Sequence, residues 1–451
     1  MKTLTLLAHE LRSGTTSSRR LVEECLARIA DPAGEGSRVF LKVHAQGALA
    51  AADYHDQLRR LGAQTSQWAG IPLSVKDLFD MAGDVTTAGS KVLADDPVAS
   101  TDALAVARLR TAGFIPIGRT NMTELAFSGL GLNPHYGTPR NPFERPLGRI
   151  PGGSSSGAAV SITDQMAYAA LGTDTGGSCR IPAALCGIVG FKPTARRVPL
   201  DGTFPLSQTL DSIGPLAASV ACCATLDAIL AAQPTDGLLP AELRGVRFAV
   251  PRSYVLDGLD PHVARNFERA LSSLAQAQAQ ITELSLSELT ELPRINRKGG
   301  FSAAETCAQH RDRLRTHAAE FDPRIAARIL RGEEQSAADY IDLIQARGRL
   351  QQRVAAQLIS FDAVLMPTTP VIAPSLAELE ADEEYARVNL LMLRNPAIAN
   401  FLDRCAISLP CHEPGTAPVG LMVMGAHDSD RRLLSLAAAI EPLVSPSLSG
   451  Q

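Results

Sequence analysis

Residues 151–180 read PGGSSSGAAVSITDQMAYAALGTDTGGSCR, and this stretch indicates how the chain folds. The small and apolar residues after the first glycine pair predict a helix over 155–167, and the apolar run after it predicts a strand over 168–172. A turn rich in glycine and serine precedes the helix, and another follows the strand. Glycine allows another group to approach the backbone closely, and neighbouring hydroxyls can react. The two turns are therefore candidates for a functional site.

Strands and helices alternate on both sides of this stretch. Upstream, we expect helices over 17–30, 48–61 and 102–112 and strands over 71–75 and 114–118. Downstream, we expect helices over 216–232, 261–284 and 430–443 and strands over 246–251, 361–366 and 419–424. The segment 285–359 has helix-forming residues and no strand signal. This order predicts an α/β fold in one large domain.

Composition excludes several function classes. The 451 residues carry a formal net charge of -4, which argues against a broad phosphate-binding surface, and 13 Phe, 6 Tyr and one Trp are few for base stacking. No apolar run approaches the roughly 18 residues of a membrane span. Eight scattered cysteines form no CxxC motif or Cys/His cluster, so we expect reduced thiols and no metal site. A cytoplasmic protein without direct nucleic-acid or membrane contact is the expectation.

The two glycine-rich turns admit several interpretations. They are common loop sequences, and they lack the lysine of a GxxxxGK[ST] phosphate-binding loop. Residues 153–157 match GxSxG, the nucleophile motif of α/β-hydrolases, with Ser155 as the nucleophile and His412 or His427 as the base. That motif requires a strand directly before the serine, whereas 145–153 has the composition of a loop.

Lys76 adds a further interpretation, because it follows a buried strand directly. Burial would lower its pKa and make it a base. With Lys76 included, the sequence resembles the amidase signature family in an ordered series of segments. The dense part of the resemblance covers 70–217, with matching segments at 70–77, 118–122, 136–142, 152–157, 172–183, 187–194 and 211–217, and weaker similarity at 418–421.

The resemblance implies a Ser–cisSer–Lys triad. Ser178 falls at the nucleophile, Ser154 at the bridging serine after a cis peptide bond, and Lys76 at the base. The backbone N–H groups of residues 175–178 would form the oxyanion hole, which comprises Thr175, Gly176, Gly177 and Ser178. Other positions brace the serine loops or border the substrate pocket: Ser155, Asp174 and Arg180 in the first group, and Ala126, Phe127 and Ser128 in the second.

One position departs from the family pattern. Ser156 stands where many members have glycine, and we expect it to cap the following helix without abolishing activity. The polar C-terminal stretch 390–411 is expected to supply more of the pocket, through Arg394, Asn395, Asn400, Asp403 or Arg404.

The resemblance further implies an α/β/α sandwich around a central mixed sheet, with both serine loops at one edge of the sheet. Within this single domain, 1–69 would form an N-terminal helical part, 70–217 the signature core and 285–360 a helical insertion or flank. The implied function is hydrolysis of a small-molecule carboxamide, anilide or urea-like amide without a cofactor, and the resemblance is compatible with a homodimer. The alternatives are a glutamine-hydrolysing subunit of a tRNA-dependent amidotransferase, a biuret- or allophanate-type hydrolase, and a catalytically silent binding protein.

Overall fold

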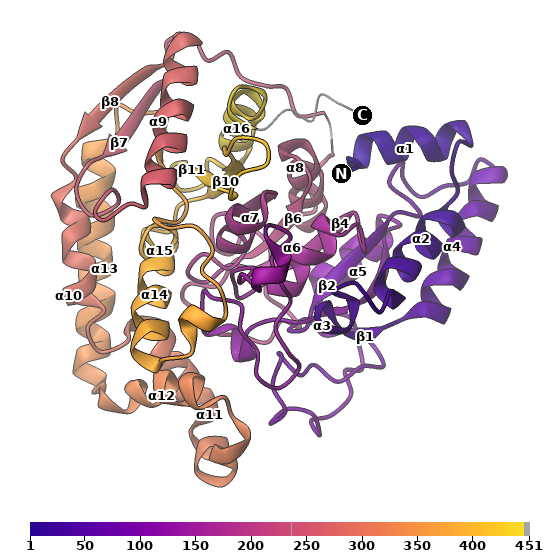
Figure 1. The fold of residues 1–451 in the computed structure, drawn as a ribbon, viewed down its shortest axis with the longest axis horizontal. Coiled ribbons are helices and arrows are strands. Elements are labelled where there is room, and N and C mark those ends of the chain that lie inside the picture. The colour runs from indigo at the N-terminus through magenta and orange to yellow at the C-terminus, as the bar shows by residue number, and fades with distance from the viewer. Residues whose placement is uncertain (236, 446–451) are drawn as a thin grey trace.

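The central feature of the fold is one mixed β-sheet. The computed structural model describes residues 1–235 and 237–445, so the expected domain end at 451 lies outside the described residues. Eleven strands lie in the order β1-β3-β2-β4-β6-β5-β10-β11-β9-β7-β8 (Figure 1). Their bounds are β1 Phe40–Val43, β2 Pro72–Lys76, β3 Ile115–Thr120, β4 Ala169–Thr173, β5 Val189–Lys192, β6 Ile213–Ala217, β7 Arg247–Pro251, β8 Gln280–Leu284, β9 Ala363–Pro367, β10 Ala406–Pro410 and β11 Gly420–Met424. Strand β2 pairs in parallel with β3 and β4, and β7 pairs in parallel with β8 and β9, whereas the other pairs are antiparallel.

Helices surround this sheet. The α-helices are α1 Leu4–Ser13, α2 Ser18–Ala30, α3 Gly36–Val39, α4 Ala45–Arg60, α5 Leu104–Thr111, α6 Ser156–Thr163, α7 Arg180–Cys186, α8 Val220–Leu230, α9 Pro261–Gln276, α10 Leu292–Ile295, α11 Gly300–His317, α12 Pro323–Leu330, α13 Ala337–Leu358, α14 Asp382–Arg394, α15 Pro396–Phe401 and α16 Asp430–Val444. Among the described residues, none of these helices combines the length and the apolar character that crossing a membrane requires.

Two adjacent residues of β2 contact the helices that cover opposite faces of the sheet. Leu73 lies with Leu109 of α5 and Leu226 of α8 around a small apolar void. The hydroxyl of the next residue, Ser74, instead forms a hydrogen bond of 2.9 Å with Ser161 of α6. Because consecutive strand residues point to opposite faces of a sheet, α6 covers one face and α5 with α8 the other. The fold is therefore the α/β/α sandwich that the sequence predicts.

Local signals place most of the predicted elements correctly. Helix α2 begins after Ser17, whose side chain accepts the N–H of Arg20, and α9 begins after Asp260, whose side chain accepts the N–H of His262. The predicted strand over 71–75 is β2, shifted by one residue so that it includes Lys76.

The prediction of one long helix over 261–284 is wrong. Helix α9 ends at Gln276, and the backbone of Gln278 is left-handed with φ of 66°. Residues 280–284 then form β8, one of the two edge strands, which within residues 1–235 and 237–445 pairs with β7 alone. Most of β8 is exposed, so it lacks the apolar alternation that identifies a strand, and its conformation comes from its partner.

The predicted start of a helix at 216 is also wrong. Residues 213–217 form β6, a buried strand between β4 and β5, and α8 begins only after Ser219, whose side chain accepts the N–H of Cys222. Strands β1, β5 and β10 are not predicted either. Each of these strands has only four or five residues. Each adopts the extended conformation because it pairs with strands that are distant in the sequence.

The helical segment 285–360 lies at the end of the sheet that carries β7, β8 and β9 (Figure 1). An apolar cluster joins the segment to the sheet and to α15, and its members include Phe301, Leu350, Met366, Phe401 and Met422. This packing fixes the segment against β9, β11 and α15, so it can form one wall of a site beside them.

Candidate active site

Lys76 lies at the carboxyl end of β2 and is fully buried. Strands β2 and β4 are parallel neighbours, so their carboxyl ends lie at the same edge of the sheet. There, the Lys76 Nζ donates hydrogen bonds of 2.7 Å to Ser154 Oγ and 2.9 Å to Oγ1 of Thr173, the last residue of β4. The structure thus brings Lys76 to the bridging serine that the resemblance implies, and adds Thr173, which sequence reasoning missed.

The environment of Lys76 favours its neutral form. Burial lowers its pKa to about 8, because the ammonium loses its hydration, although nearby Cys179, Asp174 and Asp211 act in the opposite direction. A lysine with this pKa is partly unprotonated in mildly alkaline solution and can accept a proton from a neighbouring hydroxyl.

The loop that carries Ser154 is held tightly in place. The Gly153–Ser154 peptide bond is cis, as the resemblance implies. A Cβ atom at position 153 would lie 2.5 Å from the backbone nitrogen of Gly131, so this close approach requires glycine. The Ser155 N–H donates to the Ser178 carbonyl at 3.3 Å, and this bond connects the two serine loops. The two loops therefore form one unit around Lys76.

An ion pair braces the second serine loop from within. The Asp174 carboxylate accepts the Gly177 N–H at 2.9 Å, the Cys179 N–H at 3.1 Å and two donors of Arg180 at 2.8 and 3.0 Å. Asn400 donates to Asp174 Oδ1 at 2.9 Å and accepts from Arg180 at 2.7 Å. Burial alone would raise the pKa of Asp174, but the Arg180 guanidinium outweighs it and the pKa lies below its ordinary value. The loop conformation thus depends on a buried, charged pair.

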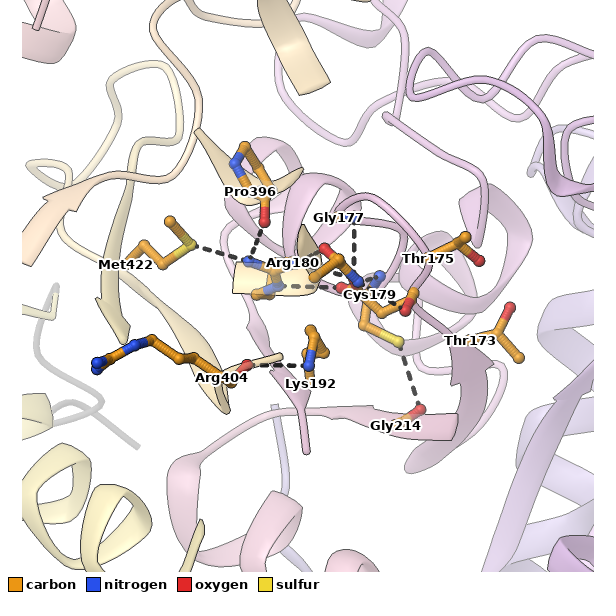
Figure 2. A network of polar contacts seen from close by, with 12 residues as sticks. Thr173, Thr175, Gly177, Cys179, Arg180, Lys192, Gly214, Pro396, Arg404 and Met422 are labelled. Atoms are coloured by element: carbon orange, nitrogen blue, oxygen red, sulfur yellow. Dashed lines mark hydrogen bonds and ion pairs between the residues drawn. The ribbon is translucent and has the colours of Figure 1, made fainter. Parts of the chain in front are cut away.

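The same network reaches across the sheet. Figure 2 shows Arg180 between Pro396, whose carbonyl accepts at 2.9 Å, and the Met422 sulfur. Below Arg180 in this view, the Lys192 Nζ donates to the carbonyl of Arg404 at 2.9 Å (Figure 2). These contacts connect the serine loop to α15 and β11, and they account for Arg180 as a positioning residue.

The four expected oxyanion donors are not equivalent. The Gly177 N–H is engaged by Asp174, as described above, whereas the N–H groups of Thr175, Gly176 and Ser178 have no hydrogen-bond acceptor within the described residues. These same three residues line a cavity. Their N–H groups are therefore the ones that remain to bind a negatively charged oxygen.

Asp211 supports this loop in a role that was not predicted. It accepts a hydrogen bond from the Thr175 hydroxyl and from the N–H groups of Leu206 and Ser207. Burial raises the pKa of Asp211 to about 7, and these hydrogen bonds limit the rise. The only sequence signal for Asp211 was that it lies in the segment 211–217, which matches the family.

A cavity of about 650 Å³ opens over Ser178. Ala126, Phe127 and Ser128 line it beside the serine loop, as the resemblance implies. The prediction that residues 390–411 contribute to the substrate pocket is correct in part. Leu390, Leu391, Leu393, Arg394, Ala397, Asn400 and Phe401 line the cavity. The lining does not include Asn395, Asp403 or Arg404.

The remaining wall comes from the helical segment, which no motif identified. Its polar lining residues include Asn296, Arg297, Ser302, Arg328 and Arg331. Arg387 of α14 also lines the cavity. Sequence reasoning had no signal for these arginines, because arginine is common on exposed helices.

The GxSxG interpretation does not fit the geometry. A loop precedes Ser155, which is buried at the start of α6, and its hydroxyl contacts the Thr173 carbonyl at 3.4 Å. Neither His412 nor His427 lines the cavity, and His427 Nδ1 contacts the carbonyl oxygen of Asp403 on the surface.

Ser156 is buried in the first turn of α6, but it does not cap the helix. Its hydroxyl contacts the carbonyl of Asn121 at 3.5 Å, and the helix has no side-chain cap. The expectation of a capping role is therefore wrong. The extra side chain is accommodated beside the loop that carries Ser154.

Comparisons with known proteins agree with this geometry. The family model described as Amidase matches residues 20–434. The chain is 36% identical to a 2-amino-5-chloromuconic acid deaminase from Comamonas testosteroni over 97% of this chain and 95% of the relative. It is 34% identical to a glutamyl-tRNA(Gln) amidotransferase subunit from Chromohalobacter salexigens, with 97% and 95% covered.

A solved structure described as an amidase superposes with a TM-score of 0.89 at 32% identity and covers 98% of this chain and 100% of that structure. The match extends over the whole sheet, both serine loops and the helical segment. The chain belongs to the amidase signature family and is a hydrolase that acts on amides.

Proposed function

We propose that this hydrolase cleaves the C–N bond of a small-molecule carboxamide, anilide or urea-like amide through an acyl-enzyme on Ser178. The observation that carries the proposal is the 2.7 Å hydrogen bond between the buried Lys76 and Ser154, on a loop joined to Ser178 beneath the cavity. A serine hydroxyl needs a base to become a strong nucleophile, and a lysine with a pKa of about 8 is a suitable base.

Acylation proceeds by a linear proton relay. Neutral Lys76 accepts the Ser154 proton while Ser154 accepts the Ser178 proton, and Ser178 Oγ forms a bond to the amide carbonyl carbon. The relay requires a hydrogen bond from Ser178 Oγ to Ser154 Oγ in the substrate complex, and Ser154 Oγ already accepts one from Lys76. The C–N bond then breaks as Ser154 returns a proton to the leaving nitrogen and Lys76 returns one to Ser154.

Deacylation uses the same groups. A water molecule gives a proton to Ser154 while Ser154 gives its own to Lys76, and the water oxygen forms a bond to the ester carbonyl carbon. The bond to Ser178 Oγ then breaks as Ser154 returns a proton to Ser178 Oγ and Lys76 returns one to Ser154, which releases the acid. In both halves the N–H groups of Thr175, Gly176 and Ser178 bind the oxyanion, and each such donor is worth roughly 3–4 kcal/mol. Gly177 supports them indirectly, because its N–H holds the loop to Asp174.

A second candidate is a glutamine-hydrolysing subunit that acts with a partner. The similarity to an amidotransferase subunit over 97% of this chain favours it. This candidate predicts that the chain alone has no activity on other amides and hydrolyses glutamine only in a complex. A biuret- or allophanate-type hydrolase remains a variant of the first candidate.

The test is ammonia or amine release by the purified chain across glutamine, aliphatic and aryl amides, anilides, biuret and a carbamate. Turnover of a non-glutamine class that is lost in Ser178→Ala but retained in Ser155→Ala would support the proposal. Loss in Ser155→Ala with activity retained in Ser178→Ala would contradict it. Activity on glutamine alone, and only with a partner protein, would favour the second candidate.

A further inference from the structure

The loop that carries the bridging serine packs against a second stretch of backbone, residues 128–131. The Gly153 N–H donates a hydrogen bond of 2.8 Å to the Gly129 carbonyl. Gly131 is left-handed with φ of 82°, and a Cβ atom there would lie 2.3 Å from the carbonyl oxygen of Gly152. The two backbones therefore touch with no side chain between them. A displacement of residues 128–131 is passed directly to the serine loop.

Asn389 of α14 holds residues 128–131 from the other side. Its Oδ1 accepts the Gly129 N–H and the Ser128 hydroxyl, each at 2.9 Å. Because a main-chain N–H can only donate, the Asn389 atom that it meets must be the amide oxygen, and this fixes the orientation of the side chain. Ser128 Oγ in turn accepts the Leu130 N–H at 3.2 Å. One amide oxygen thus orders three consecutive residues beside the serine loop.

Asn389 is a polar residue in an apolar part of α14. It is fully buried, and its helix neighbours Tyr385, Val388 and Met392 belong to an apolar cluster. Its Nδ2 atom is buried and has no hydrogen-bond partner in the described part of the chain. A buried amide donor without an acceptor lowers stability, and a leucine of similar size would avoid this loss. The two bonds to Oδ1 are therefore what the structure gains from an asparagine here.

Asn389 acts without touching the cavity. Among the described residues of α14, the lining consists of Arg387, Leu390, Leu391, Leu393 and Arg394. Any role of Asn389 in the reaction must therefore pass through the backbone that it holds. That backbone leads by two hydrogen bonds, at Gly129 and Gly153, to the residue before Ser154.

We propose that Asn389 is a positioning residue for the bridging serine and holds Ser154 where its hydroxyl can reach both Lys76 and Ser178. The inference rests on the proposed function, which gives Ser154 its part in the relay. The Lys76–Ser154 hydrogen bond is 2.7 Å long. Proton transfer requires such short distances, and a misplacement of about 1 Å can lower a rate by about 10²-fold.

The first test removes the amide oxygen. Asn389→Leu keeps a similar volume and should lower kcat by about 10- to 100-fold, with KM changed by less than about threefold. Asn389→Asp keeps an acceptor for both donors and should recover most of the loss. An unchanged kcat in Asn389→Leu, or a loss confined to KM, would overturn the inference. If Asn389→Leu does not fold, Asn389→Ala is measured in its place with the same expectations.

Two matched amides test whether Asn389 acts on the reaction or on substrate recognition. Adipamic acid and hexanamide have the same six-carbon chain and the same amide, and only the first ends in a carboxylate. Because Asn389 acts on the serine loop, Asn389→Leu should lower kcat by the same factor on both. A loss confined to one of the two amides would assign Asn389 to recognition and overturn the inference.

Asn266 of α9 supplies the matched control. It is also a buried asparagine within a helix, and its amide contacts the His262 carbonyl at 2.9 Å and the Arg269 guanidinium at 3.2 Å. Asn266→Leu should lower the denaturation midpoint and leave kcat unchanged. An equal fall of kcat in Asn266→Leu and Asn389→Leu would attribute both losses to destabilisation and overturn the inference.

Hydrogen exchange separates this inference from the proposed function. In peptides that span 150–157, exchange should be faster in Asn389→Leu than in the wild type or Asn266→Leu, because the Gly153 N–H loses a fixed acceptor. If the wild type hydrolyses no amide, the proposed function fails, and faster exchange still supports the positioning of this loop by Asn389. Unchanged exchange would overturn the inference. If amides are hydrolysed and exchange rises while kcat stays the same, only the further inference fails.

Discussion

The two walls of the cavity differ in how their polar groups are satisfied. On the wall formed by the serine loops, Asp174 and Arg180 are fully buried and make all their contacts with protein groups. On the wall formed by the helical segment, Arg297 and Arg331 are exposed and Arg328 lacks a carboxylate partner. On the first wall the ion pair is satisfied within the protein, whereas the second wall presents charge to a ligand.

This difference separates two tasks. Changes to the first wall should affect every substrate alike, since they alter the reacting groups or the loop that holds them. Changes to the second wall should alter the choice of substrate and leave the reaction itself intact. The following variants test whether the two walls are independent in this way.

The largest effect is expected for Lys76→Ala. Removing the base should lower kcat by about 10²- to 10⁴-fold, by a similar factor on neutral and acidic amides. Partial recovery is expected at high pH, where hydroxide can replace the lysine. Steady-state kinetics on adipamic acid and hexanamide would measure the loss in kcat and its recovery at high pH. A loss restricted to one substrate would show that the two walls are not independent.

The next effect concerns stability. Asp174→Asn leaves the buried Arg180 without its charged partner and should lower the free energy of unfolding by about 3–5 kcal/mol. Denaturant titration followed by circular dichroism measures this change. The control is Glu384→Gln, which breaks the exposed pair with Arg387 on the other wall and should leave the denaturation midpoint unchanged. Similar midpoints for Asp174→Asn and the wild type would contradict the bracing role.

A pH profile tests the state of the base. The proposed relay requires neutral Lys76, so kcat/KM should rise with pH and level off above the pKa of about 8, with about a tenfold loss per unit below it. The midpoint should be the same for neutral and acidic amides.

Lys192 is the matched control for this assignment, because burial lowers its pKa to about 8 as well. It donates to the main-chain carbonyls of Pro193 and Arg404, away from the cavity. Lys192→Met should therefore keep the midpoint, even where stability falls. A shifted midpoint in this variant would assign the titration to Lys192 instead.

The smallest effect is expected for Ser156→Gly, which restores the residue common in the family. Its one hydroxyl contact, 3.5 Å to Asn121, is weak, so kcat/KM should change by less than about twofold on either substrate. Glycine in place of serine in the helix should lower the free energy of unfolding by only about 0.5 kcal/mol. A change in kcat/KM of more than tenfold would show that the Ser156 side chain matters more for the serine loop than its single weak contact implies.

Much of the arrangement of the first wall was predictable from sequence. Glycine and serine must stand at fixed positions where backbones approach closely, so Gly153 and Ser154 leave a recognisable pattern. Lys76 was identified because a lysine at the end of a buried strand needs a partner. No sequence pattern reveals that Asp174 accepts the N–H of Gly177, one of the four expected oxyanion donors.

The second wall and parts of the sheet were not predictable by the same means. Arg328 stands in a helix whose sequence resembles many exposed helices, and only the fold brings it over Phe127. Strand β8 was missed for a similar reason. Its mostly exposed sequence is compatible with a helix, and it forms a strand because it pairs with β7. Both depend on contacts between residues that are distant in the chain.

The position of the helical segment in the strand order has a consequence for how such enzymes diversify. The chain leaves the sheet after β8 and re-enters at β9, and both strands flank β7. Residues can therefore be inserted, deleted or replaced between β8 and β9 without changing any strand neighbour. Because this excursion carries Arg297, Arg328 and Arg331, a new substrate preference can arise there while Lys76 and the serine loops stay unaltered.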